Sequence, residues 1–380
     1  MKILVVAGSL LFCQAVFGQY KFVSKADSLI YELYQLQGKN NAFFDDGQFP
    51  AQRGNRRVPD NTIFFNALIS FTLKGLSNKL SPASATFIDS ICNRIQPNYI
   101  HYQHASGQAT YNFWRTKPAH FFPNSFVLSH LSCFHVPDDA DCTAMIFLTD
   151  SSLTSQTHWL QQKLIEHANS SHLNINNTFK RFRRFKAYST WFGKKMPIEF
   201  DICVQSNVLL FIFKNKLPLT LQDEQTLDLL HKQIVSGDYL KYAYYLSPSY
   251  KKKAIVLYHL SRLLENNSIS QLNDCRAVIK NDIENELKKE TEFMDKVLLS
   301  TALIRMKGTP LTVEWPASIE KELTKYTFFR ANLFSSYARP SLKFITRSNL
   351  FDIRFYCKSY CLALLAEYEQ LMAQRIQTTR

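Results

Sequence analysis

Three aspartates stand together where a helix is expected to begin, and carboxyl groups in such a place can transfer protons. Asp138, Asp139 and Asp141 lead into the apolar run 142–148. A carboxyl group becomes a proton donor near neutral pH when burial or a neighbouring negative charge raises its pKa. Aspartates at this position also cap helices, because their oxygens accept hydrogen bonds from the first backbone N–H groups. The pattern therefore predicts a helix cap, an acid site, or both in the same residues.

Two further acidic positions have a similar setting. Asp201 precedes another apolar run, and Asp45 lies in a polar loop. If the loops at one rim of the fold converge, four acids would face one cavity: Asp45, Asp139, Asp141 and Asp201. Two carboxylates roughly 5–10 Å apart can hydrolyse a glycosidic bond, so a carboxylate pair in a cleft is one possible chemistry.

Aromatic and basic side chains accompany these acids. Trp114 and Trp191 lie in polar segments next to cations, and Tyr245 belongs to a tyrosine-rich stretch. Such rings line pockets for sugars or stabilise cations, although they also pack in ordinary cores. Arg53 lies near Asp45 and would either bind an anion or neutralise the acids. We expect an acidic, aromatic-lined cleft formed by these residues.

No metal or cofactor is expected. His101 and His104 are three residues apart, but no carboxylate or cysteine stands beside them at metal-ligand spacing. The sequence has no glycine-rich phosphate loop and no Gly-x-Ser-x-Gly motif. The cysteines form no Cys-x-x-Cys pair, and most of them are interpreted as small buried side chains.

The elements that must position these residues are helices. Only 10 glycines and 13 prolines occur in 380 residues, which favours long helices over a β-sandwich or barrel. Apolar periodicity predicts about twelve helices in consecutive antiparallel pairs, stacked as a solenoid or closed into a ring. The main predicted helices are 24–36, 61–74, 82–95, 139–149, 154–169, 201–214, 222–235, 250–265, 270–288 and 292–306, with two or three more in 316–376.

The first residues predict export. Met1-Lys2 and the apolar run 3–17 are typical of a signal peptide, with cleavage expected after Gly18. Residues 1–18 would be removed, and residues 19–380 would form a single domain in the periplasm or outside the cell. Nucleic acid is therefore a poor partner for this chain.

The net charge of +14 is uneven along the chain. No acidic residue occurs between Glu166 and Glu199, whereas the segment from Lys180 to Lys195 is rich in lysine and arginine. This segment predicts contact with an anionic surface such as phospholipid, lipopolysaccharide or an acidic glycan, or else a solvated loop.

The stretch from Pro137 to Met145, Pro-Asp-Asp-Ala-Asp-Cys-Thr-Ala-Met, resembles the Asp-x-Asp-Asp-Thr-Ala segment of class II terpene cyclases. These belong to the superfamily of terpenoid cyclases and protein prenyltransferases, whose members are α/α toroids of about six helix hairpins. Stretches 201–213 and 239–264 resemble toroid helices more loosely, so the likeness covers about a third of the chain. The resemblance implies an all-α (α/α)6 toroid. It also makes Asp139 the first motif acid and Asp141 the proton donor, with Cys142 in place of a further acid.

Three functional hypotheses follow. The first is an exported toroid whose acidic, aromatic cleft binds a small-molecule, glycan or lipid ligand. The second is a terpene-cyclase-like enzyme with Asp141 as general acid, which requires an apolar cavity around that residue. The third is a glycan-active hydrolase or lyase, which requires a polar groove and a carboxylate pair. A fold alone does not choose among them.

Overall fold

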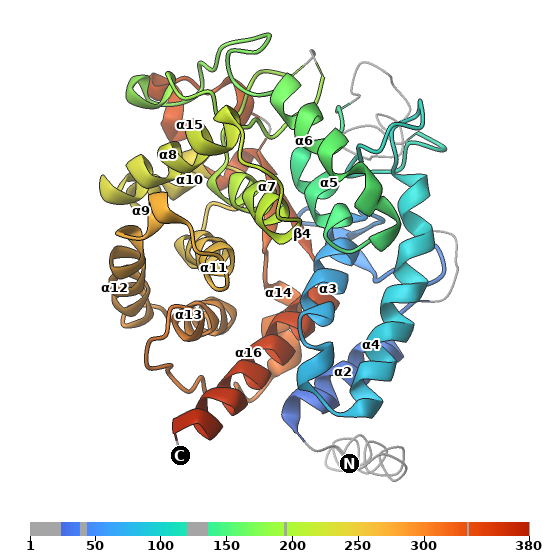
Figure 1. Cartoon of the computed structure of the whole chain (residues 1–380). Coiled ribbons are helices and arrows are strands. Elements are labelled where there is room, and N and C mark those ends of the chain that lie inside the picture. Colours follow the sequence, from blue (N-terminus) through green and yellow to red (C-terminus); the bar gives the residue numbers. More distant parts are fainter. Residues whose placement is uncertain (1–23, 39–43, 120–135, 194–195, 333, 380) are drawn as a thin grey trace.

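The computed structural model describes residues 24–38, 44–119, 136–193, 196–332 and 334–379 (Figure 1). The predicted signal peptide, Cys133, Lys194 and Lys195 lie outside these ranges. Within them the chain forms 15 α-helices and one small antiparallel sheet of four strands. The prediction of a mostly helical protein is confirmed. The prediction that every element is a helix is wrong, because the described residues also form the sheet.

The helices follow the predicted order, with several of a single turn added. Their bounds are α2 (Lys25–Leu36), α3 (Phe64–Lys74), α4 (Pro82–Ile95), α5 (Ala140–Phe147), α6 (Thr157–Glu166), α7 (Ile202–Lys214), α8 (Leu221–Val235), α9 (Asp238–Lys241), α10 (Ala243–Leu246), α11 (Lys253–Leu264), α12 (Cys275–Leu287), α13 (Phe293–Arg305), α14 (Ile319–Lys325), α15 (Lys343–Arg347) and α16 (Lys358–Thr379).

Capping side chains determine where several helices begin. Ser24 accepts a hydrogen bond from the Asp27 amide at the start of α2, and Ser81 caps α4 with a proline in the first turn. The predicted start of α3 is wrong. Asp60 belongs to a strand, and α3 begins at Phe64, three residues after the expected Asn61.

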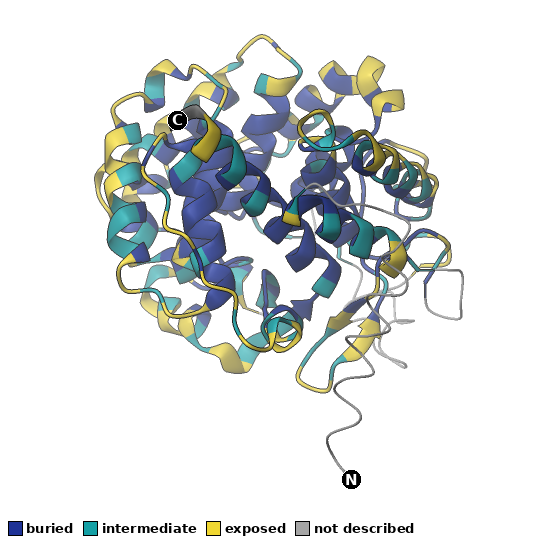
Figure 2. Cartoon of the chain, turned by 90° about the horizontal axis from the view of Figure 1, so that it is seen from below, coloured by how far each residue is buried: buried dark blue, intermediate teal, exposed yellow. Residues whose placement is uncertain are grey.

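Six helices form a closed series of contacts, in which each packs on the next and the last packs on the first. α3 contacts α5, α5 contacts α7, α7 contacts α11, α11 contacts α13, α13 contacts α16, and α16 contacts α3. α7 is buried continuously from Ile202 to Ile212, and Figure 2 shows such dark blue helices inside a more exposed shell. α12, which packs on α8, α11 and α13, buries one stripe. That stripe consists of Cys275, Ile279, Ile283 and Leu287.

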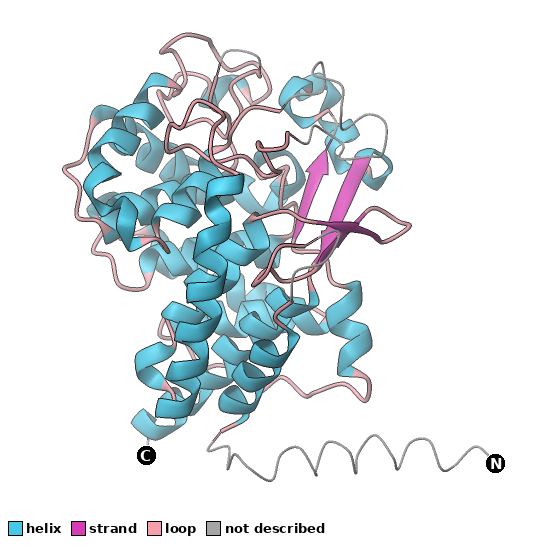
Figure 3. Ribbon diagram, turned by 90° about the vertical axis from the view of Figure 1, so that its right-hand side faces the viewer, coloured by secondary structure: helices cyan, strands magenta, loops and turns pink. Residues whose placement is uncertain are grey.

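The sheet joins distant parts of the chain. Its strands are β1 (Ala51–Arg53), β2 (Val58–Asp60), β3 (Phe329–Asn332) and β4 (Asp352–Tyr356), in the order β2-β1-β4-β3. β1 pairs with β4 so that Arg53 lies opposite Phe355. Figure 3 shows the sheet at one side of the helices. It brings the segment before α3 next to the segment before α16.

The six cysteines in the described ranges are buried and form no disulfide with one another. The interpretation of these cysteines as small buried side chains is confirmed for Cys92, Cys142, Cys203, Cys275, Cys357 and Cys361. Of the helices described, none is both long and apolar enough to cross a bilayer.

Candidate functional site

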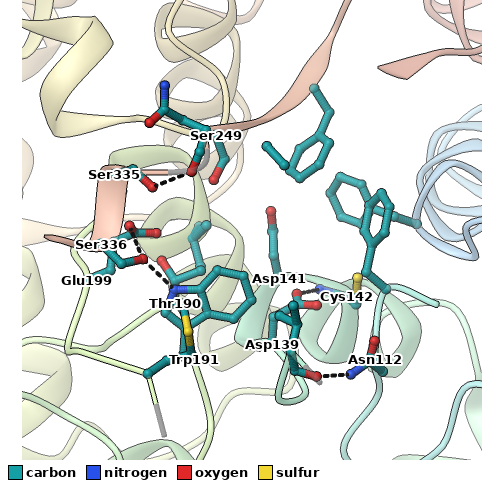
Figure 4. A pocket seen from close by; sticks show the side chains of 18 of the residues that line it. Asn112, Asp139, Asp141, Cys142, Thr190, Trp191, Glu199, Ser249, Ser335 and Ser336 are labelled. Carbon is teal, nitrogen blue, oxygen red and sulfur yellow. Dashed lines mark hydrogen bonds between the residues drawn. The ribbon is translucent and has the colours of Figure 1, made fainter. Parts of the chain in front are cut away.

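A cavity of about 370 Å³ lies where the N-terminal ends of α3, α5 and α7 meet the sheet (Figure 4). Seven of its 21 lining residues are aromatic. The rings come from Phe64, Phe113, Trp114, Trp191, Phe329, Tyr337 and Phe355. The wall also carries the carboxyl groups of Asp139, Asp141 and Glu199. The cavity therefore combines an apolar wall with acidic groups.

Asp139 both caps α5 and lines the cavity. Its Oδ1 accepts a hydrogen bond of 2.6 Å from the Cys142 amide, and its side chain is almost wholly buried. Burial raises the pKa of Asp139 to about 8, with smaller contributions from the neighbouring charges of Asp141 and Asp138. The capping role is therefore confirmed, and it coexists with a place in the cavity wall.

Asp141 also lines the cavity and is held by two donors. Asn207 donates to its Oδ1 at 2.6 Å, and the hydroxyl of Tyr250 donates to its Oδ2. Burial raises the pKa of Asp141 above its ordinary value, while the hydrogen bonds from Asn207 and Tyr250 and the charge of Arg262 act in the opposite direction. The Asp141 carboxyl group is thus buried and held in one orientation by two donors. The donors and Arg262 offset part of the cost of burying its charge.

Arg262 fixes the orientation of Asn207. The Arg262 Nη2 donates at 2.5 Å to the Asn207 Oδ1, and a guanidinium group has no acceptor atoms. The amide NH₂ of Asn207 must then face Asp141. Arg262 is itself 5% exposed and lies over the rings of Phe71 and Tyr258. Four helices, α5, α7, α11 and α3, contribute to this buried arrangement.

Glu199 is an acid of the cavity that sequence reasoning missed. It lies two residues before Asp201, is 2% exposed, and accepts a 2.7 Å hydrogen bond from the Ser336 hydroxyl. Burial raises its pKa, and hydrogen bonds from Ser336, Ser335 and Trp191 act in the opposite direction. Figure 4 shows it on the Trp191 side of the cavity, apart from Asp139. In the sequence, the only feature that indicates its burial is its place between Ile198 and Phe200.

Asp201 caps α7 but does not line the cavity. Its Oδ1 accepts from the Cys203 amide at 2.9 Å and from the Ser247 hydroxyl at 2.5 Å, and its Oδ2 accepts from the Ser249 amide at 3.0 Å. Burial raises its pKa to about 7, against the effect of these donors. Asp201 therefore ties the start of α7 to the loop before α11.

The predicted aromatic residues divide into two groups. Trp114 and Trp191 line the cavity, and the Trp114 indole donates to the Asp60 Oδ1 at 3.1 Å. Tyr245 lies elsewhere, where its hydroxyl donates to the Ala338 carbonyl at 3.0 Å. The two tryptophans thus stand beside the acids, whereas the tyrosine anchors a loop.

Asp45 and Arg53 do not line the cavity. Asp45 pairs with Arg115 at 3.3 Å, and Arg53 pairs with Asp60 at 2.8 Å. The four acids expected at one rim are therefore not all brought together, because Asp45 binds Arg115 and Asp201 binds Ser247 and Ser249 outside the cavity wall.

Among the described residues, one group of side chains could hold a metal ion. The ligand atoms of His231, Asp274 and Cys275 lie within 4.8 Å of one another on α8 and at the start of α12. His231 Nε2 already lies 2.8 Å from the Asp274 Oδ2. None of the three lines the cavity.

A scan against protein-family models finds no match for this chain, and a search of curated proteins finds none either. The chemistry available to the cavity follows from its own residues. It can enclose a small apolar body, place a buried carboxyl group against it, and surround positive charge with aromatic faces.

Proposed function

We propose that the protein binds a small, largely apolar molecule in the cavity at the N-terminal ends of α3, α5 and α7. The observation that carries this proposal is a cavity of about 370 Å³ whose wall includes seven aromatic rings. Burial of apolar surface contributes roughly 25 cal/mol per Å², so such a wall favours an apolar ligand over a polar one. The carboxyl groups in the wall then orient the ligand.

We also propose that the circuit from α3 to α16 is the inner ring of an (α/α)6 toroid. Six helices pack in succession and the last returns to the first, which supports six hairpins closed into a ring. In this arrangement the N-terminal ends of inner helices lie at the cavity, as those of α3, α5 and α7 do.

A neutral fluorescent probe tests ligand binding. We expect N-phenyl-1-naphthylamine to bind saturably to residues 19–380 and farnesol to displace it. Ala331→Trp places a large ring in the cavity wall and should weaken probe binding at least tenfold, whereas Ile100→Trp adds the same ring at an exposed position and should not. Equal affinity in both variants, or no saturable binding by the parent chain, contradicts the proposal.

A second candidate function is terpene-cyclase-like catalysis with Asp141 as the general acid. The observation that favours it is a buried carboxyl group with a raised pKa in an aromatic cavity. The carboxylic O–H of Asp141 would transfer its proton to an alkene carbon, and the resulting carbocation would be stabilised by ring faces. Attack by a second alkene closes a ring, and proton loss to water ends the reaction and allows Asp141 to be reprotonated.

Deuterium labelling tests this step. Incubation with polyprenyl substrates in D₂O should give cyclised products that contain deuterium at the protonated carbon. Asp141→Asn should remove turnover, because an amide is not an acid of comparable strength, while probe binding persists. Asp150→Asn provides the same replacement at a helix cap outside the cavity and should leave turnover intact. Turnover by Asp141→Asn contradicts the role of this acid.

The glycan alternative has less support from the cavity. Glu199 is engaged by Ser336, and Asp139 caps α5, so neither carboxyl group is left free to act as one of a catalytic pair. Export remains part of the proposal, because residues 1–18 have the character of a signal peptide. Fractionation of cells expressing the whole chain, followed by N-terminal sequencing, should give an exported product that begins at Gln19.

A further inference from the structure

The segment 334–351, which follows β3 and contains α15, presents large apolar side chains to solvent beside the cavity. Leu350 is 89% exposed, Phe344 is 64% exposed and Tyr337 is 60% exposed. Phe334 and Leu342 in the same segment are also exposed. Isolated exposed apolar residues are ordinary, but five within 17 positions indicate an interaction surface.

This segment packs on the basic part of the chain. Asn177 donates to the Ser336 carbonyl at 2.8 Å, and the Lys343 Nζ lies 5.7 Å from the centre of the Phe179 ring. Figure 1 shows α15 close to α10, and the two helices are in contact. Residues 176–186 and 334–351 therefore form one surface, here called the basic–apolar surface.

The charge of the basic–apolar surface is positive throughout. Residues 176–186 and 334–351 contain no acidic residue. The two segments hold eight cations, namely Lys180, Arg181, Arg183, Arg184, Lys186, Arg339, Lys343 and Arg347. In the described part of the chain, Arg181 is the one of these that forms an ion pair, with Asp238. Exposed apolar groups thus lie among cations.

We propose that the basic–apolar surface docks on an anionic lipid bilayer. Cations near a membrane surface are attracted to anionic headgroups, and exposed apolar side chains enter the boundary between headgroups and acyl chains. A solvated loop explains the cations but leaves the exposed phenylalanines and leucines without a role. A nucleic acid would engage the cations, yet Leu350 and Phe344 supply aliphatic and aromatic surface that fits acyl chains better.

The position of this surface relates it to the cavity. Tyr337 is largely exposed and also lines the cavity, and Ser335 and Ser336 line it too. A docked bilayer would therefore lie next to the cavity entrance, where an apolar ligand could pass from lipid to protein. This last step rests on the proposed ligand binding, whereas docking itself does not.

Vesicle sedimentation tests the docking. Residues 19–380 should sediment with large vesicles of phosphatidylglycerol and phosphatidylcholine in equal parts at low salt. They should stay in solution with vesicles of phosphatidylcholine alone, and high salt should weaken the anionic interaction. Absence of binding to the anionic vesicles, or equal binding to both compositions, overturns the proposal.

Two matched pairs of variants locate the surface. Arg339→Gln with Arg347→Gln should weaken vesicle binding about tenfold or more, because each cation near the surface contributes roughly fivefold. Lys214→Gln with Lys288→Gln removes the same charge from exposed positions elsewhere and should have little effect. An equal loss in both double variants shows only a general attraction of a basic protein and overturns the assignment of this surface.

The apolar contribution is tested separately. Phe344→Ser with Leu350→Ser should weaken binding roughly tenfold at every salt concentration, because it removes side chains that enter the lipid. Val235→Ser with Ile100→Ser alters exposed apolar positions outside the surface and should retain binding. Ala331→Trp, which fills the cavity, should also retain vesicle binding, so that failure of docking and failure of ligand binding are distinguished.

Discussion

At the scale of single residues, the cavity depends on carboxyl groups that are buried and yet supplied with donors. Asp139 illustrates why capping and function need not be alternatives. The N-terminal end of a helix offers backbone N–H groups, and in this chain such an end also forms the wall of a cavity. One carboxyl group therefore completes a helix and faces a ligand site.

The Asp201 side chain gives a stability prediction. Both of its oxygens accept hydrogen bonds, so Asp201→Asn would set an amide NH₂ against an existing donor, such as the Ser249 amide. We expect the free energy of unfolding to fall by about 1–3 kcal/mol. Urea denaturation at pH 8, above the pKa of about 7 of Asp201, measures it. Asp89→Asn, at an exposed position within α4, should change it by less than about 0.5 kcal/mol. Equal effects of the two replacements contradict this account.

Some site residues were predictable and others were not, for a physical reason. Asp139 and Asp141 stand out because they open an apolar helical run, a pattern visible in one stretch of sequence. Glu199 has no such local signal. Its burial depends on Ser336, which lies 137 residues further along the chain. Asp45 pairs with Arg115 outside the cavity, and Arg115 is again far along the sequence.

At the scale of elements, local chemistry predicted the helices and failed on the strands. α2, α4 and α7 begin within one residue of their predicted starts, because a cap and the apolar stripe behind it are both local. The strands are three to five residues long, and β1 pairs with β4, which lies about 300 residues further along the chain. Such short segments carry too little alternation to be recognised from sequence.

The start of α8 gives a prediction at this scale. Thr220 and Asp223 form a capping box, in which each side chain bonds the backbone of the other. Thr220→Ala removes one half of the box and should lower the free energy of unfolding by about 1 kcal/mol. Asp228→Ala, at an exposed position within α8, should change it less. Urea denaturation compares the two, and a larger loss in Asp228→Ala would contradict the role of the cap.

At the scale of the whole molecule, the circuit of six helices and the sheet exclude water from several acids at once. Asp139 and Asp201 begin neighbouring helices, α5 and α7, which pack against each other. Their burial is a property of the assembled fold, because in the unfolded chain both are solvated. Proton binding at these residues is therefore coupled to folding.

This coupling predicts that stability falls as the pH rises from 6.5 to 8. The folded pKa values of about 7 for Asp201 and about 8 for Asp139 lie above the unfolded value of 3.8, so the folded state retains protons that the unfolded chain has lost. Each group lowers the free energy of unfolding by at most about 1.4 kcal/mol per pH unit. Buried His259, whose pKa is lowered, acts in the opposite direction, but only below about pH 6.5.

Urea denaturation of the parent chain and of Asp139→Asn across this pH range tests the predicted fall in stability. Asparagine keeps the oxygen that caps α5 but does not titrate, so the decline in the free energy of unfolding should become shallower. Asp150→Asn makes the same replacement at a cap outside the cavity and should leave the decline as it is. A parent chain that grows more stable towards pH 8 would mean that Asp139 is ionised when folded. The carboxyl groups of the cavity would then serve as fixed charges for a cationic ligand rather than as acids.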